Sequence, residues 1–367
     1  MTAGRFARQV RAAGSILAAP IILAGALAAR PAAAADAEAL LVAGEQAFVD
    51  GDLDLALVKF EAAVEAAPER WEGYYYCGLV NQQKGNAALA EEWYRKAIAK
   101  KPDASEAQNN LAVLLLESGK IDEALEASKA AVEADPDGYE AAYTLAEVLE
   151  AAGRIEEAIE AYGKSAKLSP GDPDPLLAVA DLSHASGDDA AAAAALVEAF
   201  ARAPQKIELG LMALELLVVS GKREEALALA RKLGKRLAGK GGGGMVEAAL
   251  RVARSLRSLG DPAAALDLLE ALPSADMKSF SILTEIGLDW LALGNCKKAA
   301  KAFDEALEAK PDSSAAKVAK ADSLCCAGKW WKAKKAYKKF LKKAKPGDPM
   351  IAVVEAKLAA GKKSCKK

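Results

Sequence analysis

Glycine recurs in this chain at a fixed period of 34 residues, and that period limits the possible folds more than any other feature. The series has nine members: Gly51, Gly85, Gly119, Gly153, Gly187, Gly221, Gly260, Gly294 and Gly328. Each step is 34 residues, except for one of 39 between Gly221 and Gly260. An alanine lies five residues after every one of these glycines. Six of the glycines are also followed, 17 residues later, by a proline. A low-complexity helix would not keep this phase, so the sequence predicts structural repeats.

One repeat, residues 71–104, shows how the spacing would fold. Its first helix leads to Gly85, which allows the left-handed conformation of a turn between two helices. The second helix has its small and aromatic residues on one face, Tyr94 among them, and ends before Pro102, which cannot continue a helix. Such a helix pair cannot bury its apolar face alone, so neighbouring pairs must stack. The chain is therefore predicted to be all-α.

This pattern resembles the tetratricopeptide repeat family over residues 37–347, which would form nine repeats. In the second repeat the matching positions are Gly78, Gly85, Ala90, Tyr94, Ala97 and Pro102. The resemblance implies a right-handed α-solenoid of about nine antiparallel helix pairs. Repeat six departs from the pattern, because Leu214 stands where a small residue is expected.

Six segments are predicted along the chain. They are a signal peptide at 1–35, repeats one to six at 37–238, a glycine-rich spacer at 239–244, repeats seven to nine at 245–347, a C-terminal capping helix at 348–360 and a basic tail at 361–367. The spacer predicts a hinge or kink between two sub-arrays, because glycine-rich segments are flexible. The capping helix would cover the last repeat with Ile351, Val354 and Leu358.

The first 35 residues have the pattern of a secretory signal peptide. Three arginines precede an uncharged apolar stretch at 14–29, and small residues suited to cleavage follow at 31–35. We expect export, to a bacterial periplasm or cell envelope. An uncleaved N-terminal anchor is the alternative, because Arg30 lies just before the cleavage region.

Side chains suited to catalysis or metal binding are few. The only histidine, His184, has Asp181 and Ser183 beside it on one helix, whereas a catalytic triad needs groups from several elements. The five cysteines include no C-x-x-C pair, which argues against a zinc or thioredoxin-like site. We predict no enzymatic activity, no catalytic residue, no cofactor and no metal site, and no nucleic-acid partner.

Four cysteines near the C-terminus are candidates for disulfides. Cys296 follows the turn of repeat eight, and Cys325 and Cys326 precede the turn of repeat nine. Equivalent turns of adjacent repeats stack, so Cys296 would pair with Cys325 or Cys326 in an oxidising compartment. The remaining one of the two would then be available to Cys365. Unpaired thiols are the alternative.

Charge is divided unevenly along the chain. Residues 297–367 hold 20 lysines and 7 acidic residues, a net charge of +13, whereas residues 36–296 hold 25 basic and 44 acidic residues, a net charge of −19. Residues 330–344, WWKAKKAYKKFLKKA, combine an apolar face with lysines around it. The simplest interpretation is the second helix of repeat nine with lysines in solvent. The alternative is contact of this lysine-rich end with anionic lipid, an acidic polymer or an acidic protein.

The resemblance also implies that the first helix of each repeat lines a concave groove. The candidate ligand residues at these positions are Tyr75, Gln82, Asn109, Tyr143 and Glu147. Aromatic and amide side chains suit an extended peptide or a sugar chain, and the acidic residues favour a basic ligand. We expect a non-catalytic scaffold of the cell envelope that binds a protein segment in this groove. A glycan- or polymer-handling subunit of an envelope export or assembly machine is the alternative.

Overall fold

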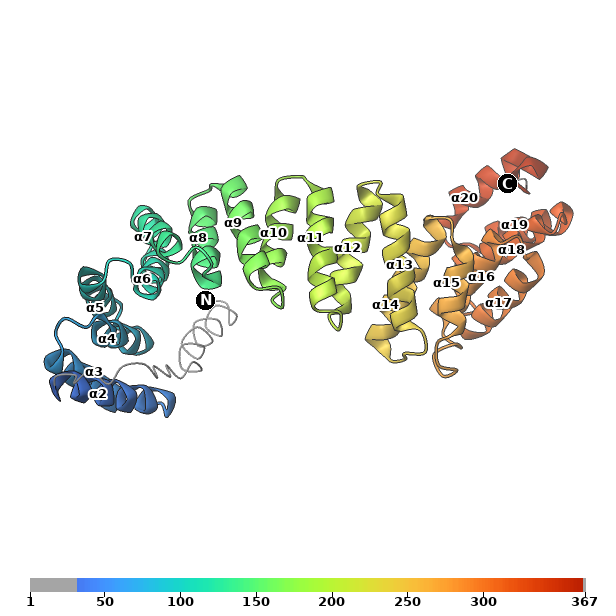
Figure 1. Cartoon of the computed structure of the whole chain (residues 1–367). Helices are drawn as coiled ribbons and strands as arrows, with labels where there is room; N and C mark the ends of the chain where they lie inside the picture. The colour runs from blue at the N-terminus through green and yellow to red at the C-terminus, as the bar shows by residue number, and fades with distance from the viewer. Residues whose placement is uncertain (1–31, 366–367) are drawn as a thin grey trace. The chain divides into compact units, whose positions relative to one another are not determined.

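The computed structural model describes residues 32–365, and these contain nineteen α-helices, one short 3-10 helix and no strand (Figure 1). The all-α prediction is confirmed. Residues 1–31 of the predicted signal peptide lie outside the described residues, and Ala32 is the first residue of the first helix.

Two compact units divide the chain between Leu182 and Ser183. The helices of the first unit are α2 (Ala32–Val49), α3 (Leu53–Ala66), α4 (Trp71–Gln83), α5 (Ala87–Lys100), α6 (Ser105–Glu117), α7 (Ile121–Ala134), α8 (Tyr139–Ala151) and α9 (Ile155–Leu168). The division falls within α10 (Asp174–Ala185).

The second unit continues the alternation of helices. Its members are α11 (Asp189–Arg202), α12 (Ile207–Val219), α13 (Arg223–Leu237), α14 (Gly243–Ser258), α15 (Pro262–Glu270), α16 (Phe280–Ala292), α17 (Cys296–Ala309), α18 (Ser314–Cys326), α19 (Trp330–Lys343), α20 (Met350–Ala360) and η1 (Gly361–Cys365). Within each unit, consecutive helices pack as pairs, for example α4 on α5 and α16 on α17.

The turn inside each pair is built on the periodic glycine, as Gly85 illustrates. Its φ is +79°, in the left-handed region that favours glycine. The Gly85 N–H donates to the carbonyl of Gln82 at 3.0 Å, and the Asn86 N–H donates to the carbonyl of Asn81 at 2.9 Å. These two bonds form a Schellman motif, which satisfies the last carbonyls of α4. All nine glycines of the series have φ between +70° and +88°.

The contact between the two helices of a pair depends on a small residue seven positions before that glycine. A Cβ atom on Gly44 would lie 2.5 Å from a ring carbon of Phe60, and a Cβ atom on Gly287 would lie 2.6 Å from a ring carbon of Phe303. In both repeats the aromatic residue is 16 positions further along the chain, on the second helix, and is fully buried. The backbone of the first helix therefore forms the wall against which the aromatic ring packs.

In repeat six the larger residue of this contact is on the first helix and the small one is on the second. Leu214 occupies the position that is small elsewhere, and the residue 16 positions later is Ala230. Leu214 is 1% exposed and Ala230 is fully buried, so both belong to the core of the second unit. The departure from the repeat pattern thus preserves the total side-chain volume between the two helices.

The glycine-rich spacer is packed against the rest of the second unit. The connection between α13 and α14 comprises residues 238–242, and Gly243 and Gly244 belong to α14. A Cβ atom on Gly241 would lie 2.6 Å from Oδ2 of Asp276 and 2.8 Å from Cγ of Pro273, so the backbone approaches the α15–α16 connection closely. Helices α13 and α14 also pack on each other across the connection. A hinge at the spacer, with sub-arrays at 37–238 and 245–347, stays a prediction.

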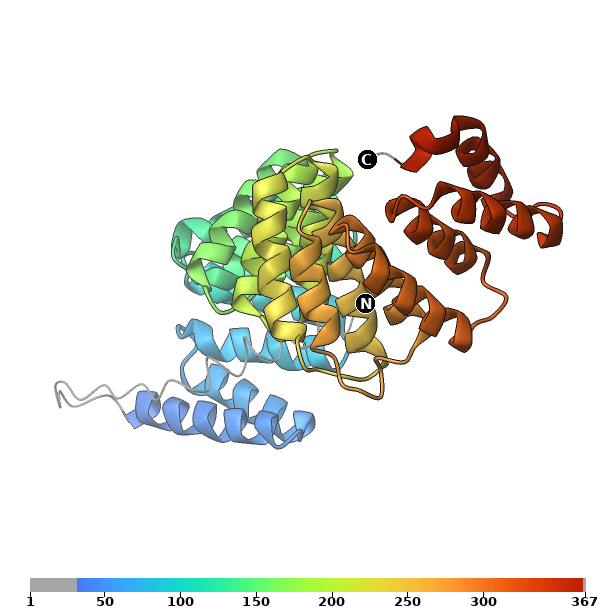
Figure 2. The same cartoon turned by 90° about the vertical axis from the view of Figure 1, so that its right-hand side faces the viewer.

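Helices α18, α19 and α20 lie together at the C-terminal end (Figure 2). Val354 of α20 is fully buried and packs in one cluster with Trp330 and Tyr337 of α19. Two disulfides fasten this region. Cys296–Cys326 joins α17 to α18 with a Cα–Cα distance of 5.6 Å, and Cys325–Cys365 joins α18 to η1 with a Cα–Cα distance of 4.9 Å.

None of the helices within residues 32–365 combines the length and the apolar character that crossing a membrane would require.

Candidate functional site

The five candidate groove residues differ in how much of the side chain reaches the surface. Tyr75 is 3% exposed, and Asn109 and Tyr143 are each 9% exposed, so these three are core side chains. Gln82 and Glu147 are half-buried. The two tyrosine rings pack on tyrosines of the second helices, Tyr75 on Tyr94 and Tyr143 on Tyr162. A ligand on this side of the first unit would therefore meet mainly the polar residues around these rings.

Gln82 serves an internal contact. Its Oε1 accepts a hydrogen bond of 2.6 Å from the hydroxyl of Tyr94, on the second helix of the same repeat. Two repeats further along the chain, Glu150 accepts the hydroxyl of Tyr162 in the same way, at 2.8 Å. In both repeats, the twelfth residue of the first helix thus supplies the acceptor that a buried tyrosine hydroxyl needs. This structural role accounts for the polar side chain at both places.

Polar contacts connect the first helices of neighbouring repeats. Arg70 donates to Glu38 at 2.6 Å and to Glu72 at 3.0 Å, and the hydroxyl of Tyr76 donates to Glu45. Further along, Nδ2 of Asn110 donates to the hydroxyl oxygen of Tyr75 at 3.1 Å. Helices α2, α4 and α6 therefore present one connected polar surface, and Arg70 neutralises part of its negative charge.

Asn109 carries an unused hydrogen-bond acceptor. Its Oδ1 is buried and has no hydrogen-bond partner among the described residues. A buried amide oxygen without a partner costs free energy, and a water molecule or a ligand donor can relieve that cost. Asn110, the next residue of α6, donates instead to the hydroxyl oxygen of Tyr75 at 3.1 Å.

Acidic residues dominate the surface beside these groups. We define the acidic face as Glu106 and Glu117 of α6 with Glu140, Glu147 and Glu150 of α8. Burial raises the pKa of Tyr75, and the negative charges of Glu106 and Glu140 raise it further. Carboxylates from α6 and α8 therefore act on the same tyrosine of α4.

Glu147 and Glu150 act on Tyr162 in the same manner. Burial raises the pKa of this tyrosine most, followed by its hydrogen bond to Glu150, and the charge of Glu147 adds to the shift. Glu106, Glu117 and Glu140 are exposed, and no described cation forms an ion pair with them. Glu106, Glu117 and Glu140 thus give the acidic face negative charge that no ion pair of the first unit neutralises.

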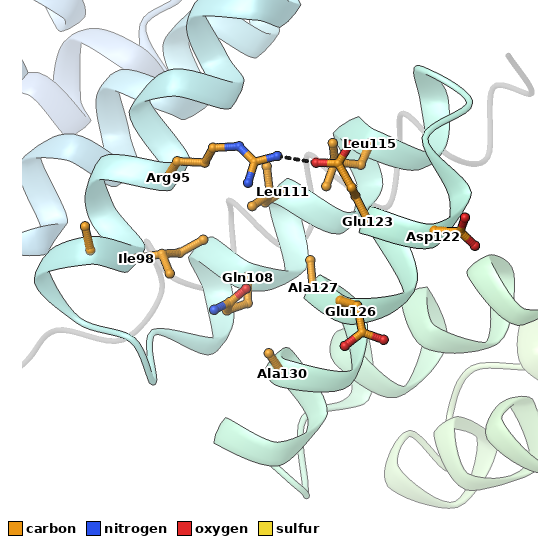
Figure 3. A pocket seen from close by; sticks show the side chains of 11 residues that line it. Arg95, Ile98, Gln108, Leu111, Leu115, Asp122, Glu123, Glu126, Ala127 and Ala130 are labelled. Carbon is orange, nitrogen blue, oxygen red and sulfur yellow. Dashed lines mark hydrogen bonds and ion pairs between the residues drawn. The ribbon is translucent and has the colours of Figure 1, made fainter.

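A pocket of about 670 Å³ opens on the other side of the first unit, between α5, α6 and α7 (Figure 3). Its floor includes the buried Leu111 and Leu115. Arg95 donates to Glu123 at 2.6 Å across it, and Asp122 and Glu126 lie at the same edge. Sequence analysis singled out none of these residues, because the pocket depends on the separation between α5 and α7, which no motif encodes.

The second unit contains a row of arginines that sequence analysis also missed. Arg251, Arg254 and Arg257 follow one another at three-residue steps on α14. Arg251 binds Glu208 and Glu215 of α12, at 2.8 and 2.7 Å. The spacing is a signal for one helix face. The partners were not predictable, because they come from other helices, 36 and 43 residues away for Arg251.

The other two arginines bind acidic residues of α16. Arg254 donates to Glu285 at 2.6 Å, and Arg257 donates to Oδ1 of the fully buried Asp289 at 2.9 Å. Oδ2 of Asp289 has no hydrogen-bond partner among the described residues. Burial raises the pKa of Asp289 to about 7, although the charge of Arg257 acts in the opposite direction. This network is a candidate for pH-dependent stability.

Comparison with known proteins adds a family match. A model described as tetratricopeptide repeat matches residues 41–105, 109–173 and 284–349, together more than half of the chain. These ranges contain repeats one to four, eight and nine of the predicted series. No curated protein matches the chain.

Several solved structures are similar to parts of the chain. PilF from Pseudomonas aeruginosa is 22% identical over 56% of this chain and 93% of that chain, with a TM-score of 0.46. MamA from Desulfovibrio magneticus RS-1 is 19% identical over 47% of this chain and 97% of its own, with a TM-score of 0.43. YrrB, a TPR protein with an unusual peptide-binding site, is 20% identical over 49% of this chain and 91% of its own, with a TM-score of 0.41.

Proposed function

Since the chain belongs to the tetratricopeptide repeat family, whose members are protein-interaction scaffolds, we propose that its first unit binds a basic protein segment on the acidic face. The observation that carries this proposal is that the carboxylates of Glu106 and Glu140 are exposed, form no ion pair with a described cation and both act on the same tyrosine, Tyr75. Ionised carboxylates only accept hydrogen bonds. They therefore select a ligand rich in donors, such as the backbone N–H groups and the lysine or arginine side chains of an extended peptide.

The buried tyrosines have a supporting role in this proposal. Tyr75 and Tyr143 hold the first helices against the second helices, so that the residues of the acidic face keep their spacing. Replacing either ring with alanine would leave a cavity in the core, and a loss of binding would then report unfolding. A test of the ligand site must therefore use exposed residues.

The test is selection of a displayed library of random 12-residue peptides on the chain. We expect the enriched peptides to be rich in lysine and arginine. Their affinity for E106Q/E140Q is expected to fall about tenfold, because each exposed charge contributes up to about 1 kcal/mol.

The matched control is E133Q/E160Q, which removes two exposed glutamates from the second helices α7 and α9 of the same unit. Its affinity should stay within about twofold of wild type. Enrichment of acidic peptides, or equal affinities of the two double variants, would contradict the proposal.

Handling of a glycan or polymer is the second candidate function. Half-exposed tyrosines such as Tyr74 and Tyr76 could stack on sugar rings. Binding of an uncharged oligosaccharide on a glycan array, lost in a Tyr76→Ala variant and unaffected by E106Q/E140Q, would favour this function over the first.

We propose that the scaffold acts in an oxidising compartment of the cell envelope. The pairing of Cys296 with Cys326 and of Cys325 with Cys365 supports this location, because disulfides persist mainly outside the cytosol. N-terminal sequencing of the protein from an envelope fraction should find a chain that begins near Asp36. A chain that retains residues 1–35 in the membrane would instead favour the uncleaved anchor.

A further inference from the structure

Helix α19 has one large apolar side chain that takes no part in packing. Trp331 is 77% exposed, more than any other large apolar side chain among residues 36–365. The core of this region is already complete without it, because Trp330, Ala333, Tyr337 and Phe340 of the same helix are buried and pack with Val354 of α20. An indole in water without a packing role indicates a contact surface.

Lysines surround this tryptophan on the same side of the helix. The exposed lysines of α19 are Lys332, Lys335, Lys338, Lys339, Lys342 and Lys343. Trp331, Lys335, Lys338 and Lys342 follow one another at steps of four, three and four residues, so they form one stripe along α19. We call these four residues the Trp–Lys stripe. Nζ of Lys334 lies 5.3 Å from the centre of the Trp331 ring, which adds a further positive charge beside the indole.

The positive charge of the stripe is not neutralised within the second unit. No residue described in this unit forms an ion pair with the exposed lysines of α19. Two carboxylates of this region have other partners: Asp322 binds Tyr337 and Lys357, and Asp348 binds Ser314. Helix α19 itself contains no acidic residue. The stripe therefore presents positive charge that a negatively charged partner could neutralise.

The helices that support the Trp–Lys stripe are linked by disulfides. Helix α19 packs on α18, and α18 is joined to α17 by Cys296–Cys326 and to η1 by Cys325–Cys365. The helix on which α19 packs is therefore covalently tied to its neighbours on both sides.

We propose that α19 docks on an anionic phospholipid surface, with the lysines of the stripe on the headgroup phosphates and the Trp331 indole at the membrane–water interface. Lysine is attracted to anionic headgroups, and tryptophan prefers the interface because it combines an apolar ring with a polar N–H. A dissolved polyanion would satisfy the lysines alone. The exposed indole, at one end of the stripe, favours the lipid surface. The proposal does not depend on the ligand of the acidic face.

The test is flotation of the chain with lipid vesicles, together with tryptophan fluorescence. The chain from Asp36 onward retains both units and all helices except the first four residues of α2, so the apolar residues 14–29 cannot contribute to binding. We expect binding to vesicles of three parts phosphatidylethanolamine to one part phosphatidylglycerol, with a blue shift of the indole emission. Binding should weaken as salt is added, and vesicles of phosphatidylcholine alone should not bind.

Two variants examine the stripe, and a third controls for net charge. K335Q/K338Q/K342Q should weaken binding on the order of a hundredfold, because each lysine at an anionic surface contributes about a factor of five. Trp331→Ala should weaken binding severalfold and abolish the blue shift. K206Q/K222Q/K235Q removes three exposed lysines elsewhere in the second unit and should bind like wild type.

Three results would overturn the proposal. One is equal vesicle binding by K335Q/K338Q/K342Q and K206Q/K222Q/K235Q. Another is wild-type binding to phosphatidylcholine as strong as binding to the anionic vesicles. The third is capture of the chain by heparin without any binding to the anionic vesicles, which would assign the lysines to an acidic polymer.

Discussion

Gly78 lies against the ring of Tyr94, so that a Cβ atom on residue 78 would stand 2.5 Å from Cε1 of the tyrosine. The aromatic residue is fully buried, and its hydroxyl is fixed by Gln82. The ring therefore cannot move outward without breaking that hydrogen bond. The absence of a side chain at residue 78 is what allows α4 and α5 to approach each other.

Substitution of Gly78 by alanine is expected to destabilise the first unit by about 1–3 kcal/mol, because the added methyl group overpacks the contact with Tyr94. Gly163→Ala is the control, since Gly163 lies within α9 and a Cβ atom there would meet nothing within 4 Å. That change should stabilise the helix by about 0.5–1 kcal/mol. Calorimetric melting of both variants distinguishes the two effects, and equal shifts would contradict the packing argument.

Gly85 tests the turn independently of packing. Its φ is +79°, and a Cβ atom at this position would meet nothing within 4 Å, so only backbone strain opposes a side chain. Gly85→Val should cost about 1–3 kcal/mol. Gly85→Asn should cost less than half as much, because asparagine tolerates the left-handed region. Similar melting temperatures for the valine variant and wild type would show that the turn does not require this conformation.

Asp289 should make the stability of the second unit depend on pH. Burial raises its pKa from 3.8 to about 7, so the folded state binds its proton more tightly than the unfolded state does. The resulting stabilisation is fully present below about pH 4 and is lost as the pH rises through 7. Its size is on the order of a few kcal/mol.

Asp289→Asn removes this titration and keeps an oxygen that can accept from Arg257. The melting temperature of the second unit should therefore fall less between pH 5 and pH 8 in this variant than in wild type. Asp312→Asn, at an exposed aspartate of the same unit, is the control and should follow wild type. Parallel pH profiles of Asp289→Asn and wild type would show that Asp289 does not titrate in this range.

The disulfide connectivity can be resolved despite the adjacent Cys325 and Cys326. In a Cys365→Ser variant, alkylation in denaturant without reductant should label Cys77 and Cys325, and the peptides of Cys296 and Cys326 should stay linked. Labelling of Cys296 or Cys326 in this variant would exclude the pairing.

Reduction of the wild-type protein should destabilise the C-terminal helices by about 3–4 kcal/mol for each bridge, because the bridges close loops of 30 and 40 residues. Cys77 is buried, which raises the pKa of its thiol to about 12, so it should react slowly with alkylating agents even after reduction. Rapid labelling of Cys77 in the folded protein would contradict its place in the core.

The candidate groove shows where prediction from the sequence stops. The position of Tyr75 and Tyr143 on the first helices follows from the period, but their rings turn toward Tyr94 and Tyr162 and are buried. Side-chain direction depends on how closely the two helices of a pair pack, which the period does not encode. The acidic charge of this surface was predictable from composition, whereas the unpaired Oδ1 of Asn109 became visible only with its neighbours in place.

By itself, the sequence determined that this chain is a series of helix pairs of the tetratricopeptide repeat family, because its signals are local. A glycine that must adopt positive φ, a small residue that must face a large one and a helix that must end all act within 34 residues. The tertiary structure alone decided which groups from different repeats meet, such as Arg257 with Asp289 and Asn110 with Tyr75, and which of Cys325 and Cys326 pairs with Cys365. These contacts depend on the rotation of one helix pair against the next, which many side chains determine together.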